Sequence, residues 1–190
     1  MFRIDLGEGL HLEKLETRHA DALCALVEAH REALDRWSAL PTGTPTDPVG
    51  LRAWLGAQRE LEARNLAITC GIWRGDSLLG LVALAEINAD HLFAVIWGFM
   101  APSEQSRGVG TRSASAMTTY GFEALGLERV EWRCVVDNEP SRRLAERLGF
   151  TREGTLRSGA LIGSRFCDLA VYGMLAGEWA AARAAVGAPR

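Results

Sequence analysis

The chain has 190 residues, of which 48% are apolar and 24% charged, and its formal net charge is −3 at pH 7. This balance is typical of a globular protein, and the length predicts one domain, residues 1–190, with a sizeable core. The weakly acidic charge argues against a nucleic-acid partner, and no apolar run is long enough for a membrane span.

Three strands separated by turns are predicted in the middle of the chain, with helical segments on both sides. The first half is predicted to hold a strand at 10–15, a helix capped by Thr17, a helical piece at 32–37, a loop at 40–48, a helix from Asp47 to about Arg64, and strands at 66–73, 77–87 and 92–100. The second half is predicted to hold a helix from Gly108 to Leu125, a strand at 129–136, a helix at 140–148, strands at 150–157 and 165–175, and a C-terminal helical tail within 176–190. This order predicts an α/β fold with a mixed parallel and antiparallel central sheet flanked by helices.

A glycine loop follows the apolar strand at 92–100. It consists of Gln105, Ser106, Arg107, Gly108, Val109, Gly110 and Thr111. Glycines permit positive φ and a close approach of the backbone to a ligand. The first N–H groups of the helix that begins here have no partner within it, and the helix dipole adds partial positive charge. The loop therefore predicts a site for an anion such as a diphosphate.

The spacing Gln-x-x-Gly-x-Gly fits neither of two common phosphate loops. A P-loop would need Gly-Lys-Ser/Thr, and the dinucleotide fingerprint would need Gly-x-Gly-x-x-Gly near a first strand. The pattern resembles the pyrophosphate loop of the Gcn5-related N-acetyltransferases (GNAT), which bind acetyl-coenzyme A. Taken alone, it is equally well explained as a glycine turn at a helix start.

Three further blocks extend the resemblance over nearly the whole chain. Segment 138–150, Asn-Glu-Pro-Ser-Arg-Arg-Leu-Ala-Glu-Arg-Leu-Gly-Phe, is similar to the Asn-x-x-Ser … Leu-Gly-Phe block of the superfamily. Segments 153–157 and 168–175 are similar to the final hairpin of the RimJ/RimL-type branch, and 10–15 looks like the start of that branch. The chain is therefore identified as a member of the GNAT superfamily, in its RimJ/RimL-type branch.

The resemblance implies acetyl-coenzyme A as cosubstrate. The pantetheine arm would lie along the strand at 92–100, where backbone N–H groups near Phe99 and Met100 would polarise the acetyl carbonyl. The loop at 105–111 would hold the pyrophosphate, and Asn138 would contribute to the cofactor site. Asn138 also fits the simpler role of a helix N-cap.

The catalytic set implied by the resemblance is incomplete. The family tyrosine that protonates the departing thiolate would stand at Ala145 and is missing. The RimL-type branch is thought to use a serine at the position of Ser141, which could also serve only a local hydrogen bond. A thiol pKa of about 8.5 means that the thiolate needs little help to leave. Glu86 is the candidate for a base acting through water, whereas Asp90 and His91 fit surface charge in a turn.

Cysteine and histidine usage predicts neither a disulfide framework nor a metal site. The four cysteines, at 24, 70, 134 and 167, include no Cys-x-x-Cys pair and are typical of buried, reduced thiols. The four histidines form no ligand pattern. Together with the lack of a signal-peptide core at the N-terminus, these features predict a cytoplasmic protein.

The resulting hypothesis is an N-acetyltransferase that transfers acetyl from acetyl-coenzyme A to an amine acceptor in a ternary complex. The resemblance implies a protein N-terminal α-amine, such as that of a ribosomal protein, with the acceptor bound between segment 31–47 and the last hairpin. A small amine (polyamine, aminoglycoside or amino acid) is the alternative acceptor.

Two other functions are weighed against this one. A catalytically silent acyl-coenzyme A sensor stays open because the tyrosine is missing, whereas binding of another diphosphate is disfavoured by the lack of a lysine after Gly110. Many relatives in the family pair as homodimers, and the resemblance leaves that arrangement open here.

Overall fold

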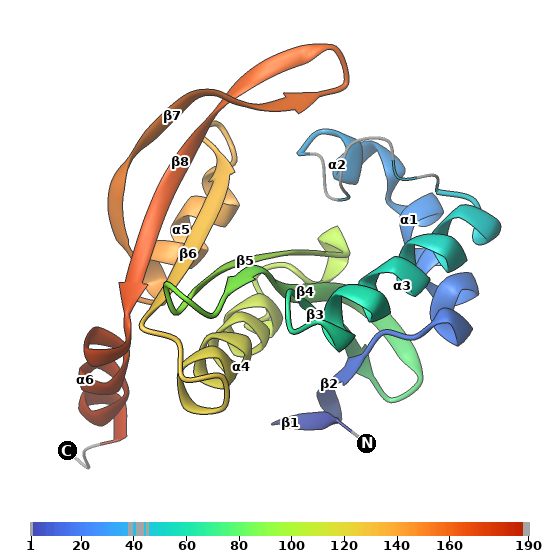
Figure 1. Cartoon of the computed structure of the whole chain (residues 1–190). Coiled ribbons are helices and arrows are strands. Elements are labelled where there is room, and N and C mark those ends of the chain that lie inside the picture. The colour runs from blue at the N-terminus through green and yellow to red at the C-terminus, as the bar shows by residue number, and fades with distance from the viewer. Residues whose placement is uncertain (1, 38–39, 41–43, 45, 188–190) are drawn as a thin grey trace.

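The computed structural model describes residues 2–37, 40, 44 and 46–187. Eight strands form one sheet in the order β1-β2-β3-β4-β5-β6-β8-β7 (Figure 1). β5 and β6 run parallel, and every other neighbouring pair of strands is antiparallel. The predicted α/β fold with a mixed sheet is confirmed.

The elements follow the predicted order closely. The strands are β1 (Arg3–Gly7), β2 (Leu10–Lys14), β3 (Ile68–Arg74), β4 (Ser77–Asn88), β5 (Phe93–Met100), β6 (Arg129–Val135), β7 (Thr151–Ile162) and β8 (Arg165–Leu175). The helices are α1 (Ala20–Ala29), α2 (Arg31–Asp35), α3 (Pro48–Ala63), α4 (Val109–Glu123), α5 (Glu139–Arg147) and α6 (Ala176–Gly187), with 3-10 turns at Thr17–His19 and Pro102–Glu104.

The N-terminal region departs from the prediction in two places. β1 was not predicted, because its alternation spans only five residues with two half-buried positions, Ile4 and Leu6. Thr17 does not cap a helix: Glu16 caps a 3-10 turn there through a reciprocal capping box with His19. The predicted cap Asp47 is confirmed, since its Oδ1 accepts hydrogen bonds of 2.9 Å from the amides of Val49 and Gly50.

Two hydrophobic clusters lie on opposite faces of the sheet. Successive residues of a strand point to opposite faces, so Ile72 belongs to the cluster beneath α4 and α5, and Trp73 to the cluster beneath α1 and α3. Figure 1 shows α1, α2 and α3 gathered on one side of the molecule and the long β7–β8 hairpin projecting on the other. The predicted C-terminal tail forms α6, in which Trp179 is 5% exposed and joins the cluster beneath α4 and α5, here called the first cluster.

Candidate active site

The parallel pairing of β5 and β6 stops half-way along β5. Residues Phe93 to Ile96 pair with Arg129 to Trp132. Beyond this point β5 continues paired to β4, and β6 continues paired to β8. Figure 1 shows the two strands diverging. Among the described residues, one backbone edge of 97–100 therefore lacks a strand partner, and it can hydrogen-bond a ligand that lies alongside like an extra strand. We call this opening the β5–β6 gap.

The alternation along β5 decides which amides face the β5–β6 gap. The N–H of Ala101 donates to the carbonyl of Leu79, next to β5 on β4, at 2.7 Å. Alternate residues of an antiparallel strand direct their amides to the same partner, so the N–H of Phe99 also faces β4. The amides of Gly98 and Met100 face the gap. Of the two predicted donors, Met100 is directed there, and Gly98 rather than Phe99 presents the second amide.

The glycine loop leads to a helix N-terminus without a side-chain cap. Gly108 occupies the N-cap position of α4 with a left-handed φ of 75°, and Ser106 is also left-handed at 60°. The first helical hydrogen bond runs from Arg112 N to Gly108 O at 3.0 Å, so the amides of 109–111 have no helical acceptor. With Gln105, Ser106, Arg107 and Gly108 exposed, these amides and the helix dipole are available to an anion.

Gly110 and Thr111 connect this helix start to its neighbours. A Cβ at Gly110 would lie 2.6 Å from Met100 Cε and 3.3 Å from Leu144 Cδ2. This glycine therefore lets α4 pack against β5 and α5, and it does not have the positive φ that the sequence suggested. Thr111 Oγ1 accepts a 3.3 Å hydrogen bond from Arg147. Arg147 is a cation beside the helix start that the sequence analysis did not single out.

The start of α5 fixes both residues that the family block predicts there. Asn138 is the N-cap, and its Oδ1 accepts a hydrogen bond of 3.2 Å from Ser141 N. The hydroxyl oxygen of Ser141 accepts one of 3.0 Å from Trp132 Nε1. Ala145, where the family tyrosine would stand, is fully buried in the first cluster. Asn138 thus has a structural role, and its contact with a cofactor stays a prediction.

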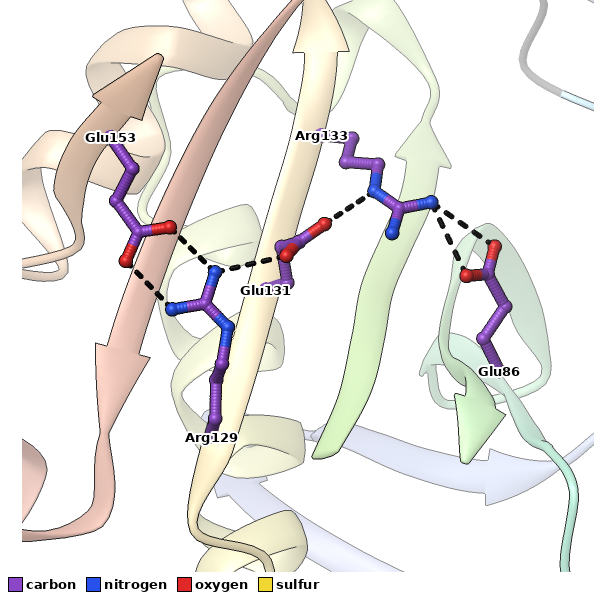
Figure 2. Close-up of polar contacts among 5 residues, drawn as sticks. All are labelled: Glu86, Arg129, Glu131, Arg133 and Glu153. Atoms are coloured by element: carbon purple, nitrogen blue, oxygen red, sulfur yellow. Dashed lines mark hydrogen bonds and ion pairs between the residues drawn. The ribbon is translucent and has the colours of Figure 1, made fainter. Parts of the chain in front are cut away.

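Glu86 lies at an irregularity near the end of β4, where its φ is 51°. Its two carboxylate oxygens lie 3.2 and 3.3 Å from Arg133 Nη1. Figure 2 shows that this pair is one end of a chain of ion pairs. The chain, which we call the ion-pair belt, consists of Glu86, Arg133, Glu131, Arg129 and Glu153.

The arginines of the ion-pair belt hold Glu131 and Glu153 in the charged form. Burial raises the pKa of Glu131, but hydrogen bonds from Arg129 and Arg133 outweigh this and leave that pKa lowered. A hydrogen bond from Arg129 likewise lowers the pKa of Glu153. The Arg129–Glu153 pair needs the glycine at position 173, because a Cβ there would collide with both side chains. Glu131 and Glu153 are therefore poor bases near neutral pH.

The two candidate catalytic residues contact consecutive residues of β6 from opposite faces of the sheet. Trp132 belongs to the cluster beneath α4 and α5, and it contacts Ser141 on that side. Arg133 is the next residue of β6 and points to the other face, where it contacts Glu86. The structure thus places the contacts of Ser141 and Glu86 on different faces of β6.

The acceptor region predicted from sequence is described only in part. A hollow of about 710 Å³ on the β7–β8 hairpin is lined by Thr155, Leu156, Arg157, Ser158 and Asp168. Asp168 pins this hairpin, since its carboxylate accepts a 2.8 Å hydrogen bond from the Ser158 amide. Of segment 31–47, residues 38–39, 41–43 and 45 lie outside the described residues.

The described part of the chain offers neither a metal-ligand cluster nor a membrane-spanning helix. Within the described ranges, no group of three or more His, Cys, Asp or Glu side chains could hold a metal ion. The helices of the described part of the chain are also too short or too polar to cross a membrane. All four cysteines are free and buried.

Comparison with known proteins identifies the fold and the family. Residues 10–151 match the acetyltransferase (GNAT) domain family. The chain belongs to the GNAT acetyltransferases. It is similar to "Putative ribosomal N-acetyltransferase YdaF" of Bacillus subtilis (strain 168), with 28% identity over 94% of this chain and 98% of YdaF. This full-length similarity supports the RimJ/RimL-type branch.

Two further comparisons concern a small-amine acetyltransferase and a protein acetyltransferase of known structure. A spermidine N(1)-acetyltransferase of Vibrio cholerae is 32% identical over 49% of this chain and 54% of its own length. The solved structure of RimL, a ribosomal L7/L12 alpha-N-protein acetyltransferase in complex with coenzyme A, superposes with a TM-score of 0.85 at 22% identity, over 92% of this chain and 98% of RimL. The last likeness establishes the shared fold.

Proposed function

We propose that this N-acetyltransferase transfers acetyl from acetyl-coenzyme A to a protein N-terminal α-amine in a ternary complex. The observation that carries the proposal is the unpaired edge of β5, which ends beside the bare N-terminus of α4. An extended arm that bears amides can pair with the edge at 97–100, and a diphosphate suits the helix start at 105–111. Acetyl-coenzyme A has both parts and supplies an activated thioester.

The proposed chemistry is divided between the two faces of the sheet. The amides of Gly98 and Met100 would donate to the carbonyl oxygen as it gains negative charge. Ser141 would donate a hydrogen bond to the departing sulfur, which leaves as a thiolate. On the other face, Glu86 would accept the proton of the amine through a water molecule.

The choice of acceptor rests on weaker support than the choice of donor. The similarity to YdaF over the full chain favours a protein N-terminus. The similarity to a spermidine acetyltransferase, which extends over about half of the chain, favours a small polyamine. The ion-pair belt has three carboxylates and two guanidiniums, and this excess of negative charge suits a cationic amine of either kind.

We also treat residues 1–190 as one N-acetyltransferase domain. All eight strands belong to one sheet, and α6 packs through the indole of Trp179, which donates a 3.2 Å hydrogen bond to Thr119 on α4. This packing supports treating α6 as part of the same unit.

Titration calorimetry with acetyl-coenzyme A, followed by a thiol-release assay, tests the proposal. The acceptors are a peptide that begins with serine, a peptide with a blocked N-terminus, and spermidine. Thiol release with the free peptide alone supports the N-terminal acceptor, and release with spermidine alone supports the small amine. Binding without release from any acceptor would contradict the enzymatic proposal and favour a sensor.

A pair of glycine variants tests the cofactor loop. Gly108 and Gly126 both have positive φ, and a Cβ at either would meet nothing within 4 Å. Gly108→Trp would place an indole before the start of α4, so we expect loss of coenzyme A binding from a folded protein. Gly126→Trp, beyond the far end of α4, carries a similar backbone cost of about 1–2 kcal/mol and should keep binding. Equal binding by both variants would refute the loop assignment.

A further inference from the structure

Two consecutive residues of β6 each contact one of the two proposed catalytic groups. Trp132 is the last residue of β6 that pairs with β5, and Arg133 is the first beyond the pairing. Strand alternation sends their side chains to opposite faces. Trp132 reaches Ser141 at 3.0 Å, and Arg133 reaches Glu86 at 3.2 Å. This step of the chain lies where β5 and β6 part.

The contact from Trp132 determines where the proton of Ser141 can point. An indole N–H donates and cannot accept, so Ser141 Oγ must be the acceptor. The hydroxyl proton then points away from the indole, where the Cys134 thiol is one acceptor within reach, and a hydroxyl that accepts one hydrogen bond donates a stronger one. Trp132 is 8% exposed and packs edge-on against Phe150 with ring centroids 5.8 Å apart. The donor is therefore held in a fixed place.

The contact from Arg133 determines where the carboxylate of Glu86 lies. Glu86 is 57% exposed as a side chain, so burial alone would not fix it. Arg133 is itself held, because its Nε donates to Glu131 and Glu131 is also bound by Arg129. The remainder of the ion-pair belt thus acts as an anchor for Arg133. Arg133 on β6 therefore orients the carboxylate of Glu86, which belongs to β4 on the other side of β5.

We infer that Trp132 and Arg133 are positioning residues, Trp132 for the hydroxyl of Ser141 and Arg133 for the carboxylate of Glu86. The inference rests on the proposed function, since it assumes that these two groups act in acetyl transfer. In the transfer step, the amine nitrogen bonds to the acetyl carbon and the carbon–sulfur bond breaks. The proton lost by nitrogen passes through water to Glu86, and the sulfur leaves as a thiolate that accepts a hydrogen bond from the Ser141 hydroxyl and takes its proton from solvent. Each positioning residue serves one of these two events.

The test combines single and double variants in the full-length protein. Trp132→Phe removes the indole N–H and keeps a ring, and Arg133→Met removes the cation and keeps much of the stem. Each of the two is made alone. Trp132→Phe is then combined with Ser141→Ala and Arg133→Met with Glu86→Gln as the contact pairs. The crossed pairs combine Trp132→Phe with Glu86→Gln and Arg133→Met with Ser141→Ala. Trp73→Phe is the matched control, because Trp73 is also 8% exposed and its indole nitrogen has no partner among the described residues.

Turnover is followed as thiol release from acetyl-coenzyme A with the acceptor that the wild type uses. Trp132→Phe and Arg133→Met should each lower kcat about tenfold, a part of the effect of general acid–base catalysis, with the KM for acetyl-coenzyme A almost unchanged. Trp132→Phe should have no further effect on Ser141→Ala, and Arg133→Met none on Glu86→Gln. The crossed pairs should be additive. Arg133→Lys should restore part of the rate, and Trp73→Phe should match the wild type.

Additive losses within either pair, or a fall in kcat for Trp73→Phe equal to that of Trp132→Phe, would overturn the inference. If the wild type binds coenzyme A but releases no thiol with any acceptor, the proposed function fails separately. The contact at Ser141 is then tested by indole fluorescence. Coenzyme A should change the emission of the wild type and of Trp73→Phe by the same amount and that of Trp132→Phe by less, because Trp97 on the 97–100 edge still responds in every variant. A response in Trp132→Phe equal to that of the wild type would contradict the placement of Trp132 beside the cofactor.

Discussion

Gly98 offers the sharpest test of how β4 and β5 are joined at the site. A Cβ at this position would fall inside contact distance of the Leu81 carbonyl oxygen and 3.0 Å from Val82 Cα. Both atoms belong to the backbone of β4, so they cannot rotate away. Overpacking of this kind typically costs 1–3 kcal/mol, and a backbone clash between paired strands lies at the upper end. We therefore expect Gly98→Ala to lose about 3 kcal/mol of a total stability of about 5–15 kcal/mol.

Urea unfolding measures this loss. With a slope of about 3 kcal/mol per M, the loss corresponds to a midpoint lower by about 1 M. Gly154→Ala is the control, because Gly154 also lies in a strand but a Cβ there would meet nothing within 4 Å. It should be neutral or gain about 0.5–1 kcal/mol, since glycine weakens a strand interior. Equal midpoints for the two variants would refute the close approach of the strands at Gly98.

Two further predictions concern stability. Asp47→Ala removes the acceptor for two amides at the start of α3 and should cost about 1 kcal/mol, seen as a lower Tm; an unchanged Tm would contradict the cap. For Glu131, the folded pKa lies below the unfolded value of about 4.3, so its stabilising contribution is present above that pH and is lost as the pH falls through the folded pKa. Glu131→Gln should therefore be less stable than the wild type at pH 7, and the difference should narrow below about pH 4; a difference that is constant with pH would exclude this charge as its cause.

The sequence predicted the elements better than the contacts between them. The glycine loop, the Asn138 block and the alternating strands are local patterns, and all three appear where they were expected. Whether the amide of Phe99 or of Gly98 faces the gap depends on which side of β5 pairs with β4, and no pattern within β5 reveals that. The bond between Trp132 and Ser141 joins a strand to the next helix, and it depends on packing that residue spacing does not determine.

The ion-pair belt was also beyond reach from sequence. Glu86 was singled out, but its partner Arg133 lies two strands away across the sheet. Gly173 would have been a hint, because a glycine in the interior of a strand often marks a close approach. A strand glycine indicates that other atoms approach the backbone closely, but it does not identify the residues to which those atoms belong.

The short pairing of β5 with β6 has a mechanical consequence for the whole sheet. Among the described residues, four strand-paired positions of β5 and β6 connect the half of the sheet formed by β1 to β5 with the half formed by β6, β8 and β7. The connection between the two halves is short, and a ligand that hydrogen-bonds along 97–100 adds backbone hydrogen bonds beyond the paired residues. Occupancy of this edge should therefore slow amide hydrogen exchange along 97–100 and at the facing end of β6. The bound cosubstrate would then link the two halves of the sheet and reduce their relative motion, in addition to delivering the group that is transferred.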